Sequence, residues 1–184
     1  MAYVAPYWSH WWVDHGVRRW LHRPQKLFGP HVTDGMTVLD VGCGMGVFSL
    51  PMARMVGPEG RVIAVDIEQR ALDVLIERAA KTGLTDRIVA RRCPADDLGL
   101  AEFAAQAGFA LAFWMVHEAP DLGGFLAQVR AALRPGGRFL VVEPHFHVGR
   151  AEFVREVAAA QSAGFALMRR PRVWFSRAAL LEAV

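Results

Sequence analysis

The chain has 184 residues, of which 53% are hydrophobic and 21% charged, and its formal net charge is +3. This composition fits one globular domain and excludes an intrinsically disordered chain. No apolar run reaches the roughly 20 residues that span a bilayer, and residues 1–9 lack the charged and apolar regions of a signal peptide. We therefore expect a cytoplasmic protein without a membrane span, and Cys43 and Cys93 are too few for a disulfide framework.

The basic character comes almost entirely from arginine, because Lys26 and Lys81 are the only lysines. The arginines are scattered along the chain in pairs and short runs, such as the one at 169–172. A nucleic-acid-binding surface more often has its basic residues in one stripe. We therefore expect solvated surface charge and no nucleic acid partner.

Residues 1–34 differ from the rest of the chain in their density of aromatic side chains. Trp8, Trp12 and Val13 fit one helical face by their spacing. Two interpretations of this aromatic N-terminal segment stay open. It packs as a helix on the edge of a sheet, or it forms a lid that offers an aromatic surface to a substrate.

From Gly35 onward, apolar runs typical of strands alternate with helical patterns, which predicts a parallel sheet. The expected strands are 37–41, 61–66, 87–91, 109–114, 138–143 and 165–169. The expected helices are 47–56, 69–82, 101–107, 122–133 and 152–163, while residues 178–184 fit either a strand or a helix. Residues 35–184 should form one α/β domain of the Rossmann-like, doubly wound type, with a mainly parallel sheet and helices on both faces.

The first expected strand ends in an acid and three glycines at alternate positions, Asp40-x-Gly42-x-Gly44-x-Gly46. Glycine lets the chain turn tightly and brings backbone N–H groups close to a ligand. Between a strand and a helix, such a loop is typical of a nucleotide pocket. The dinucleotide fingerprint has a different spacing, G-x-G-x-x-G, which disfavours a nicotinamide-dependent oxidoreductase. Cys43 lies inside the loop, and we interpret it as a small packing residue.

Asp66 ends the second expected strand and follows the glycine loop along the chain. An acid at this place can accept hydrogen bonds from both ribose hydroxyls of an adenosine-containing ligand. Alone it is a weak signal, and together with the loop it is a strong one. Ile67 follows it and could pack on the face of an adenine ring.

These features together resemble the class I S-adenosylmethionine (SAM) methyltransferases. Val38–Ser49 is similar to motif I of that family, and Arg61–Leu72 is similar to motif II. Residues 109–121 resemble motif IV, and residues 133–144 resemble the family's Pro-Gly-Gly turn and fifth strand. The resemblance covers residues 35–184 and implies SAM as methyl donor, with S-adenosylhomocysteine as the product.

The resemblance also implies which residues hold the cofactor. They are Asp40, Gly42, Cys43, Gly44, Gly46, Asp66, Ile67, Ala95, Asp96 and Trp114. One position departs from the family, because Pro94 stands where an aspartate usually accepts from the adenine amino group. Asp96 could compensate, or the backbone alone could contact the adenine.

Methyl transfer from a sulfonium depends mainly on in-line placement, and a base is needed only where the acceptor must lose a proton. His117 is the first candidate base because its ordinary pKa of about 6.5 suits proton transfer, although a loop histidine can also simply cap backbone groups. Glu143, His145 and His147 alternate at the end of the fifth strand and would share one side of an extended chain. We expect no metal site, and two interpretations stay open: His145 acts in substrate contact or proton transfer, or these residues have a structural or surface role.

The segment Trp114-Met115-Val116-His117 lacks the motif of nucleic-acid amino methyltransferases, and the Pro-Cys nucleophile of cytosine-C5 enzymes is also absent. We therefore expect a SAM-dependent methyltransferase whose partner is a small-molecule acceptor, apolar or aromatic. Two alternatives stay open. One is a SAM- or nucleotide-binding module without catalysis, and the other is a methyltransferase that acts on RNA or protein.

Overall fold

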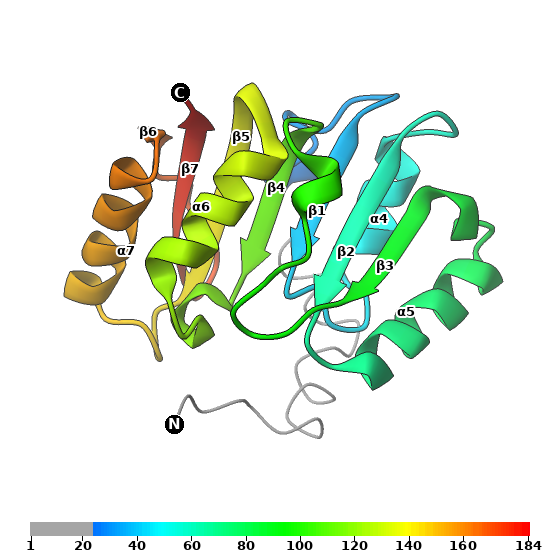
Figure 1. Ribbon diagram of the computed structural model, residues 1–184, viewed down its shortest axis with the longest axis horizontal. Helices are drawn as coiled ribbons and strands as arrows, with labels where there is room; N and C mark the ends of the chain where they lie inside the picture. Colours follow the sequence, from blue (N-terminus) through cyan, green and yellow to red (C-terminus); the bar gives the residue numbers. More distant parts are fainter. Residues whose placement is uncertain (1–23) are drawn as a thin grey trace. The chain divides into compact units, whose positions relative to one another are not determined.

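The computed structural model describes residues 24–184 of the chain (Figure 1). The chain divides into two compact units, of which the first ends at Cys93 and the second begins at Pro94. Trp8, Trp12 and most of the aromatic N-terminal segment lie outside the described residues, so the lid stays a prediction. No helix within residues 24–184 is long and apolar enough to cross a membrane.

In the first unit, parallel strands alternate with helices as the sequence predicts. The strands are β1 (Thr37–Val41), β2 (Arg61–Asp66) and β3 (Ile88–Arg92), in the spatial order β3-β2-β1. The helices are α3 (Pro24–Leu27), α4 (Ser49–Met55) and α5 (Gln69–Lys81). In this unit α4 packs on β2 and α5 packs on β3 (Figure 1). The strands β1 and β2 are nearly continuous apolar runs, as expected for strands buried on both faces.

The parallel pairing of β1 and β2 brings two predicted site segments to the same edge of the sheet. Val41 lies beside Val65, so the loop after β1 and Asp66 at the end of β2 emerge next to each other. The helix α5 covers this unit with an apolar stripe at helical spacing, in which Leu75 is fully buried. Gly83 follows α5 with φ +67°, the left-handed conformation that is typical of a glycine just after a helix.

In the second unit, four strands form the spatial order β4-β5-β7-β6. They are β4 (Ala107–Phe113), β5 (Leu133–Pro144), β6 (Phe165–Arg169) and β7 (Ser176–Ala183). The strands β4 and β5 are parallel, whereas β7 runs antiparallel to both β5 and β6. The helices α6 (Leu122–Ala132) and α7 (Arg150–Ser162) pack side by side (Figure 1). Short 3₁₀ turns are η1 (Thr85–Arg87), η2 (Ala101–Phe103) and η3 (Val116–Glu118).

Several element boundaries differ from the sequence-based expectation. The helix predicted over 101–107 is wrong: Ala105 has φ +54°, which no helix can continue, and Ala107 already belongs to β4. The fifth strand begins at Leu133 rather than at position 138, because Leu133 pairs with Ala107 before the register shifts. The residues 178–184, which fitted a strand or a helix, lie almost entirely in strand β7.

Candidate active site

The glycine loop leads from β1 into α4 and is fastened to the end of β2. The N–H groups of Gly42 and Cys43 both donate to the carbonyl oxygen of Val65, at 2.9 and 3.1 Å. Arg78 of α5 adds a bond from Nη1 to the carbonyl oxygen of Met45, at 2.9 Å. The loop therefore has a fixed shape that is set by the neighbouring strand and helix.

The two sides of this loop differ in what a side chain would meet. A Cβ atom at Gly46, which has φ +83°, would lie 2.2 Å from Cδ1 of Leu75, so this side is closed by α5. A Cβ atom at Gly44, which has φ +52°, would meet no heavy atom of residues 24–184 within 4 Å. The side at Gly44 is thus open, and a ligand can approach the backbone there.

Asp66 joins the end of β2 to the open side of the loop. Its Oδ2 accepts a hydrogen bond from the N–H of Gly44 at 2.7 Å, and its Oδ1 accepts one from the N–H of Glu68 at 2.9 Å. A carboxylate has about four lone-pair sites, so this carboxylate still has acceptor capacity on each oxygen. The half-buried Asp66 can therefore hold the loop and accept ribose hydroxyls at the same time.

Asp40 has a structural partner that the sequence did not reveal. It is only 2% exposed, and its Oδ2 accepts a hydrogen bond from Oγ of Ser49 at 2.5 Å. This bond joins the C-terminal end of β1 to the first residue of α4 and so fixes both ends of the glycine loop. The contact with the cofactor that the resemblance implies for Asp40 stays a prediction.

Cys43 is buried in the loop, and three effects disfavour its thiolate. Burial comes first, and the charges of Asp40 and Asp66 add to it, so that the pKa of the Cys43 thiol lies well above its ordinary value. The thiol therefore stays protonated and unreactive near neutral pH. Ile67, the next predicted cofactor residue, is half-buried directly after Asp66, and its carbonyl oxygen accepts from Nε of Arg92 at 3.3 Å.

The segment after β3 holds Ala95 and Asp96, which belong to the second unit. Both are exposed, as is Pro94. Gln128 of α6 braces this segment, because its Nε2 donates to the carbonyl oxygen of Asp96 at 3.1 Å and its Oε1 accepts from the N–H of Leu98 at 2.7 Å. The adenine contact proposed for Asp96 stays a prediction.

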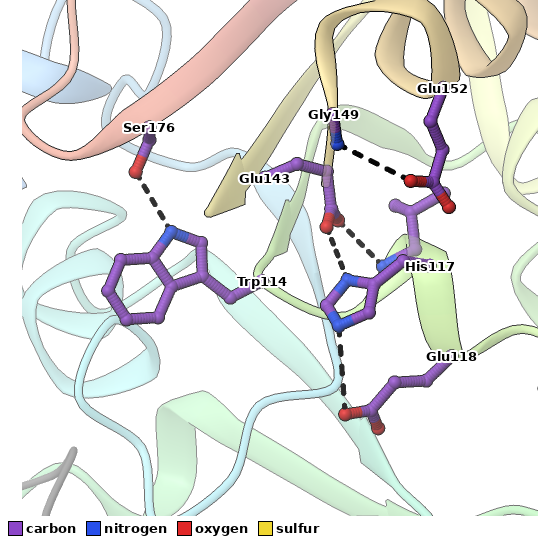
Figure 2. A network of polar contacts seen from close by, with 8 residues as sticks. Trp114, His117, Glu118, Glu143, Gly149, Glu152 and Ser176 are labelled. Carbon is purple, nitrogen blue, oxygen red and sulfur yellow. Dashed lines mark hydrogen bonds and ion pairs between the residues drawn. The ribbon is translucent and has the colours of Figure 1, made fainter. Parts of the chain in front are cut away.

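Trp114 follows β4 in a constrained conformation. Its φ of +61° is rare for a bulky residue, and its N–H donates to the carbonyl oxygen of Val142 at 2.7 Å. Its Nε1–H donates to Oγ of Ser176 at 2.9 Å (Figure 2). The ring also meets Phe146 edge-on, with 5.6 Å between the centroids. A residue held in such a conformation from two sides is a candidate for a functional role.

The strongest polar cluster of the second unit pairs His117 with Glu143 (Figure 2). The side chain of Glu143 has no exposed surface, and its Oε1 accepts from the N–H of Val116 at 2.8 Å. Its Oε2 contacts Nδ1 of His117. An ionised carboxylate only accepts hydrogen bonds, so Nδ1 carries the proton in this pair. The Nε2 atom of a neutral His117 is then the free proton acceptor.

The charge state of His117 depends on burial and on three carboxylates. Burial lowers the pKa of His117. The hydrogen bond and charge of Glu143, with weaker contributions from Glu118 and Glu156, raise the pKa by more than burial lowers it. The net pKa lies above the ordinary value of 6.5. Nε2 of His117 lies 4.0 Å from Oε1 of Glu118, and the ring of His147 lies 4.8 Å from the ring of His117.

Glu156 is a buried acid that the sequence reading overlooked. It lies on α7, is 6% exposed, and its Oε2 has no hydrogen-bond partner among the described residues. Burial, followed by the charges of Glu143 and Glu152, raises the pKa of Glu156 to about 8. Its carboxyl group lines a cavity of about 10 Å³ whose other lining residues are apolar. A cavity of this size is near the lower limit for holding one water molecule.

His145 lies apart from this cluster. The chain turns after β5, where the N–H groups of His147 and Val148 both donate to the carbonyl oxygen of Pro144. The side chains at 143, 145 and 147 therefore do not follow the alternation of an extended strand. His145 instead contacts the rings of Phe146 and Phe175, at 6.2 and 6.0 Å between centroids. In residues 24–184 no group of three or more His, Cys, Asp or Glu side chains is placed to hold a metal ion.

Two features of the site could be found only in part from the sequence. Glu143 stood out there as one of three alternating residues, but nothing marked it as the partner of His117, which is 26 positions away. Glu156 did leave a signal, because it lies among Phe153, Val157 and Ala160 on the buried side of α7. A carboxylate within an apolar helical stripe is unusual and points to a special environment.

Comparison with known proteins supplies the family. Residues 32–171 match the family described as "Methyltransferase domain". The demethylmenaquinone methyltransferase of Symbiobacterium thermophilum is 33% identical over 113 residues, which are 61% of this chain and 44% of that protein. A ubiquinone biosynthesis O-methyltransferase of Methylocella silvestris is 32% identical over 62% of this chain and 42% of that protein. The chain thus spans less than half the length of these curated relatives.

A solved structure extends the likeness to the whole fold. A SAM-dependent methyltransferase from Aquifex aeolicus superposes with a TM-score of 0.87 at 21% identity, covering 98% of this chain and 100% of that one. At this identity the likeness concerns the fold, and it confirms the predicted Rossmann-like α/β class with a mainly parallel sheet. The chain belongs to the methyltransferase domain family and has the fold of the class I SAM-dependent methyltransferases.

Proposed function

We propose that the protein transfers the methyl group of SAM to a small aromatic acceptor. The observation that carries this proposal is the joint between the glycine loop and Asp66. There the N–H of Gly44 is bonded to the Asp66 carboxylate, and the open side of the loop leaves room for a ligand. Family membership supports the same activity.

The residues of the first unit fit an adenosine-containing cofactor with a positive charge and no phosphate. The sulfonium of SAM supplies a methyl group that is already activated for transfer. Asp66 offers its remaining acceptor sites to the ribose hydroxyls, and the open backbone at Gly44 allows close approach. Asp40 contributes negative charge at the base of the loop, which favours a ligand that carries an ammonium group over one that carries phosphates.

In the second unit, His117 is the group that can remove a proton from the acceptor. Glu143 holds the proton on Nδ1, so that Nε2 of neutral His117 is free to accept one. For a hydroxylated acceptor, the oxygen forms a bond to the methyl carbon as the carbon–sulfur bond breaks. The hydroxyl proton passes to Nε2, and S-adenosylhomocysteine leaves as a neutral thioether. His145, which lies among aromatic rings, is proposed to contact the acceptor.

The chemical class of the acceptor follows from the names of the relatives. One curated protein is named for demethylmenaquinone and the other for ubiquinone biosynthesis, which supports an aromatic ring of quinone or hydroquinone type as the acceptor. We also place the protein in a reducing compartment such as the cytoplasm, because two cysteines, Cys43 and Cys93, are too few for a disulfide framework.

Calorimetry with SAM and with S-adenosylhomocysteine tests the cofactor assignment. Asp66→Ala should weaken binding of both by about 10- to 100-fold, the cost of losing hydrogen bonds to a charged group. Asp73→Ala removes an exposed carboxylate from the same unit and should leave binding unchanged. Equal affinities for the wild type and Asp66→Ala would overturn the assignment of Asp66 to the cofactor.

Turnover is a separate question from binding. Labelled methyl groups should pass from SAM to a soluble hydroquinone in the presence of the wild-type protein. Tight binding of SAM with no transfer to hydroquinones, catechols or other small hydroxylated rings would instead favour a module that binds SAM without catalysis.

A further inference from the structure

The turn between β6 and β7 presents two large aromatic side chains to solvent. The turn is closed by the N–H of Ser176, which donates to the carbonyl oxygen of Val173 at 3.2 Å. Trp174 and Phe175 lie between Val173 and Ser176, and their side chains are 67% and 54% exposed, respectively. Phe175 has φ +52°, a conformation that glycine or asparagine adopts with less strain. The fold does not need these side chains for its core, so their exposure calls for a separate explanation.

A third exposed ring lies close to this turn. Phe146, in the loop after β5, is 69% exposed. His145 links the two loops, because its N–H donates to the carbonyl oxygen of Phe175 at 3.1 Å and its ring contacts both Phe146 and Phe175. We call Phe146, Trp174 and Phe175 the aromatic tip. It is a defined apolar surface that is held by backbone and ring contacts.

Positive charge flanks the turn of the aromatic tip along the chain. Residues 165–181 contain no acidic side chain, and four arginines flank the turn: Arg169, Arg170, Arg172 and Arg177. The first three are exposed, and the guanidinium of Arg170 lies 5.7 Å from the centre of the Phe153 ring on α7. Arg150 adds a further exposed positive charge at the start of α7, and Glu152 is the nearest acid along that helix.

We propose that the aromatic tip and its arginines dock this protein on the surface of an anionic lipid bilayer. Tryptophan and phenylalanine enter the headgroup region of a membrane favourably, while arginine side chains interact with lipid phosphates. Basic residues near an anionic leaflet add attraction that salt weakens. Docking of this kind needs no membrane-spanning helix, and it is independent of methyl transfer.

Two other partners fit the surface less well. Single-stranded RNA is bound by aromatic platforms along a basic groove, whereas here the aromatic side chains project from the tip of a turn. A second copy of this chain would bring the same arginines together, and a two-fold contact of like charges is unfavourable. An anionic bilayer can bury the exposed rings of the aromatic tip and attract the arginines that flank it.

Co-sedimentation of the full chain with vesicles tests the proposal. The wild type should bind vesicles of phosphatidylcholine mixed with phosphatidylglycerol, bind pure phosphatidylcholine weakly, and release as salt is raised. Trp174→Ser/Phe175→Gly should lower partitioning by about tenfold or more through loss of apolar area. Arg170→Gln/Arg172→Gln should lower it by about 25-fold at low salt, or roughly fivefold for each arginine.

Matched controls separate the surface from general charge and hydrophobicity. Ile76→Gln removes an exposed apolar side chain from α5, and Arg61→Gln/Arg134→Gln removes the same amount of charge from other exposed positions. Both should bind vesicles like the wild type. Because glycine suits φ +52°, the Trp174→Ser/Phe175→Gly variant should keep its circular dichroism and unfolding midpoint, so loss of binding would not reflect misfolding.

Three results would overturn the proposal. They are vesicle binding that the tip and arginine variants leave unchanged, self-association that the tip variants abolish in the absence of lipid, and salt-sensitive binding to single-stranded RNA with no binding to vesicles. Since vesicle binding is measured without SAM or acceptor, its failure and the failure of methyl transfer are read separately.

Discussion

Among the single residues of the second unit, His117 depends most on its neighbours for its chemical state. The buried carboxylate of Glu143 fixes its ring and tautomer, as the N–H of Val116 in turn fixes Glu143. Such a chain of contacts orients Nε2 and stabilises the protonated imidazole that forms when a proton is taken up. His117 is thereby prepared for the role of a base, provided that it is neutral when the acceptor binds.

The pH dependence of methyl transfer tests this role. With a hydroxylated acceptor, kcat/KM should rise with pH through the pKa of His117, which lies above 6.5. Glu143→Gln removes the charge that raises this pKa, so the inflection should move to lower pH. His117→Gln should lower kcat by about 100-fold or more. SAM affinity should stay unchanged in both variants.

A matched control lies next to the pair. Glu118→Gln removes a carboxylate whose Oε1 is 4.0 Å from Nε2 of His117. It should shift the inflection less than Glu143→Gln does, because its contribution to the pKa is weaker. A rate profile that has the same inflection in the wild type and in Glu143→Gln would show that His117 is not the titrating base.

Among the elements, the turn from β1 to α4 combines a tight backbone with close packing. Gly46 and Gly136 both have positive φ, at +83° and +73°, but only Gly46 faces another side chain. The helix α5 therefore leaves no room for a side chain at Gly46, whereas no side chain of the described residues blocks Gly136 in the Pro-Gly-Gly turn. This difference allows backbone strain and steric conflict to be measured separately.

Urea unfolding of two alanine variants measures the cost of backbone strain and the cost of steric conflict separately. Gly136→Ala should lower the free energy of unfolding by about 1 kcal/mol, from strain at positive φ alone. Gly46→Ala should lower it by about 2–3 kcal/mol, because its methyl group also conflicts with Leu75. Gly46→Ala should in addition weaken SAM binding, whereas Gly136→Ala should not.

One result for Gly46→Ala and Gly136→Ala would contradict the steric conflict at Gly46. Equal losses of stability in the two variants would mean that Cδ1 of Leu75 moves aside at little cost. The loop would then be less rigid than two sets of hydrogen bonds imply: the bond that Arg78 donates to it and the bonds that it donates to the carbonyl oxygen of Val65.

For the whole molecule, the buried acid of α7 links stability to pH. Folding raises the pKa of Glu156 from 4.5 to about 8, so the folded state holds the proton more tightly than the unfolded state. The contribution of Glu156 to stability is then greatest below pH 4.5, falls as pH rises towards 8, and levels off above it. The raised pKa of His117 acts in the same direction, because its contribution is present below pH 6.5 and is lost as pH rises through the folded pKa.

Glu156→Gln tests this linkage in unfolding experiments at several pH values. The wild type should lose up to a few kcal/mol of stability, on the order of 1.4 per unit of pKa shift, between acidic and mildly alkaline pH. The variant should show a smaller slope, with only the part that belongs to His117 left. The exposed Glu59→Gln should follow the wild type, and a slope in Glu156→Gln as steep as that of the wild type would contradict the buried, protonated state of Glu156.

Much of the fold could be read from local sequence patterns. The bounds of β1, β2 and β6 agree with the predicted ones. For β1 and β2 the reason is that apolar runs such as Val62–Val65 favour buried parallel strands. The end of α5 at Gly83 was also predictable, since glycine readily takes the left-handed conformation there. Ala105 gave no comparable signal, because its positive φ comes from contacts such as the bond from its N–H to the carbonyl oxygen of Ala131.

The sequence by itself determined the strand–loop–helix pattern around Asp40 to Gly46, the acid at position 66 and hence the kind of cofactor. These features depend on backbone preferences and on side chains within a few positions of one another. Only the tertiary structure decided that Asp40 binds Ser49, that Glu143 holds His117, and that Glu156 is buried without a partner. The physical reason is that desolvation and hydrogen bonding between elements depend on how strands and helices pack, and residues 26 positions apart carry no local mark of their contact.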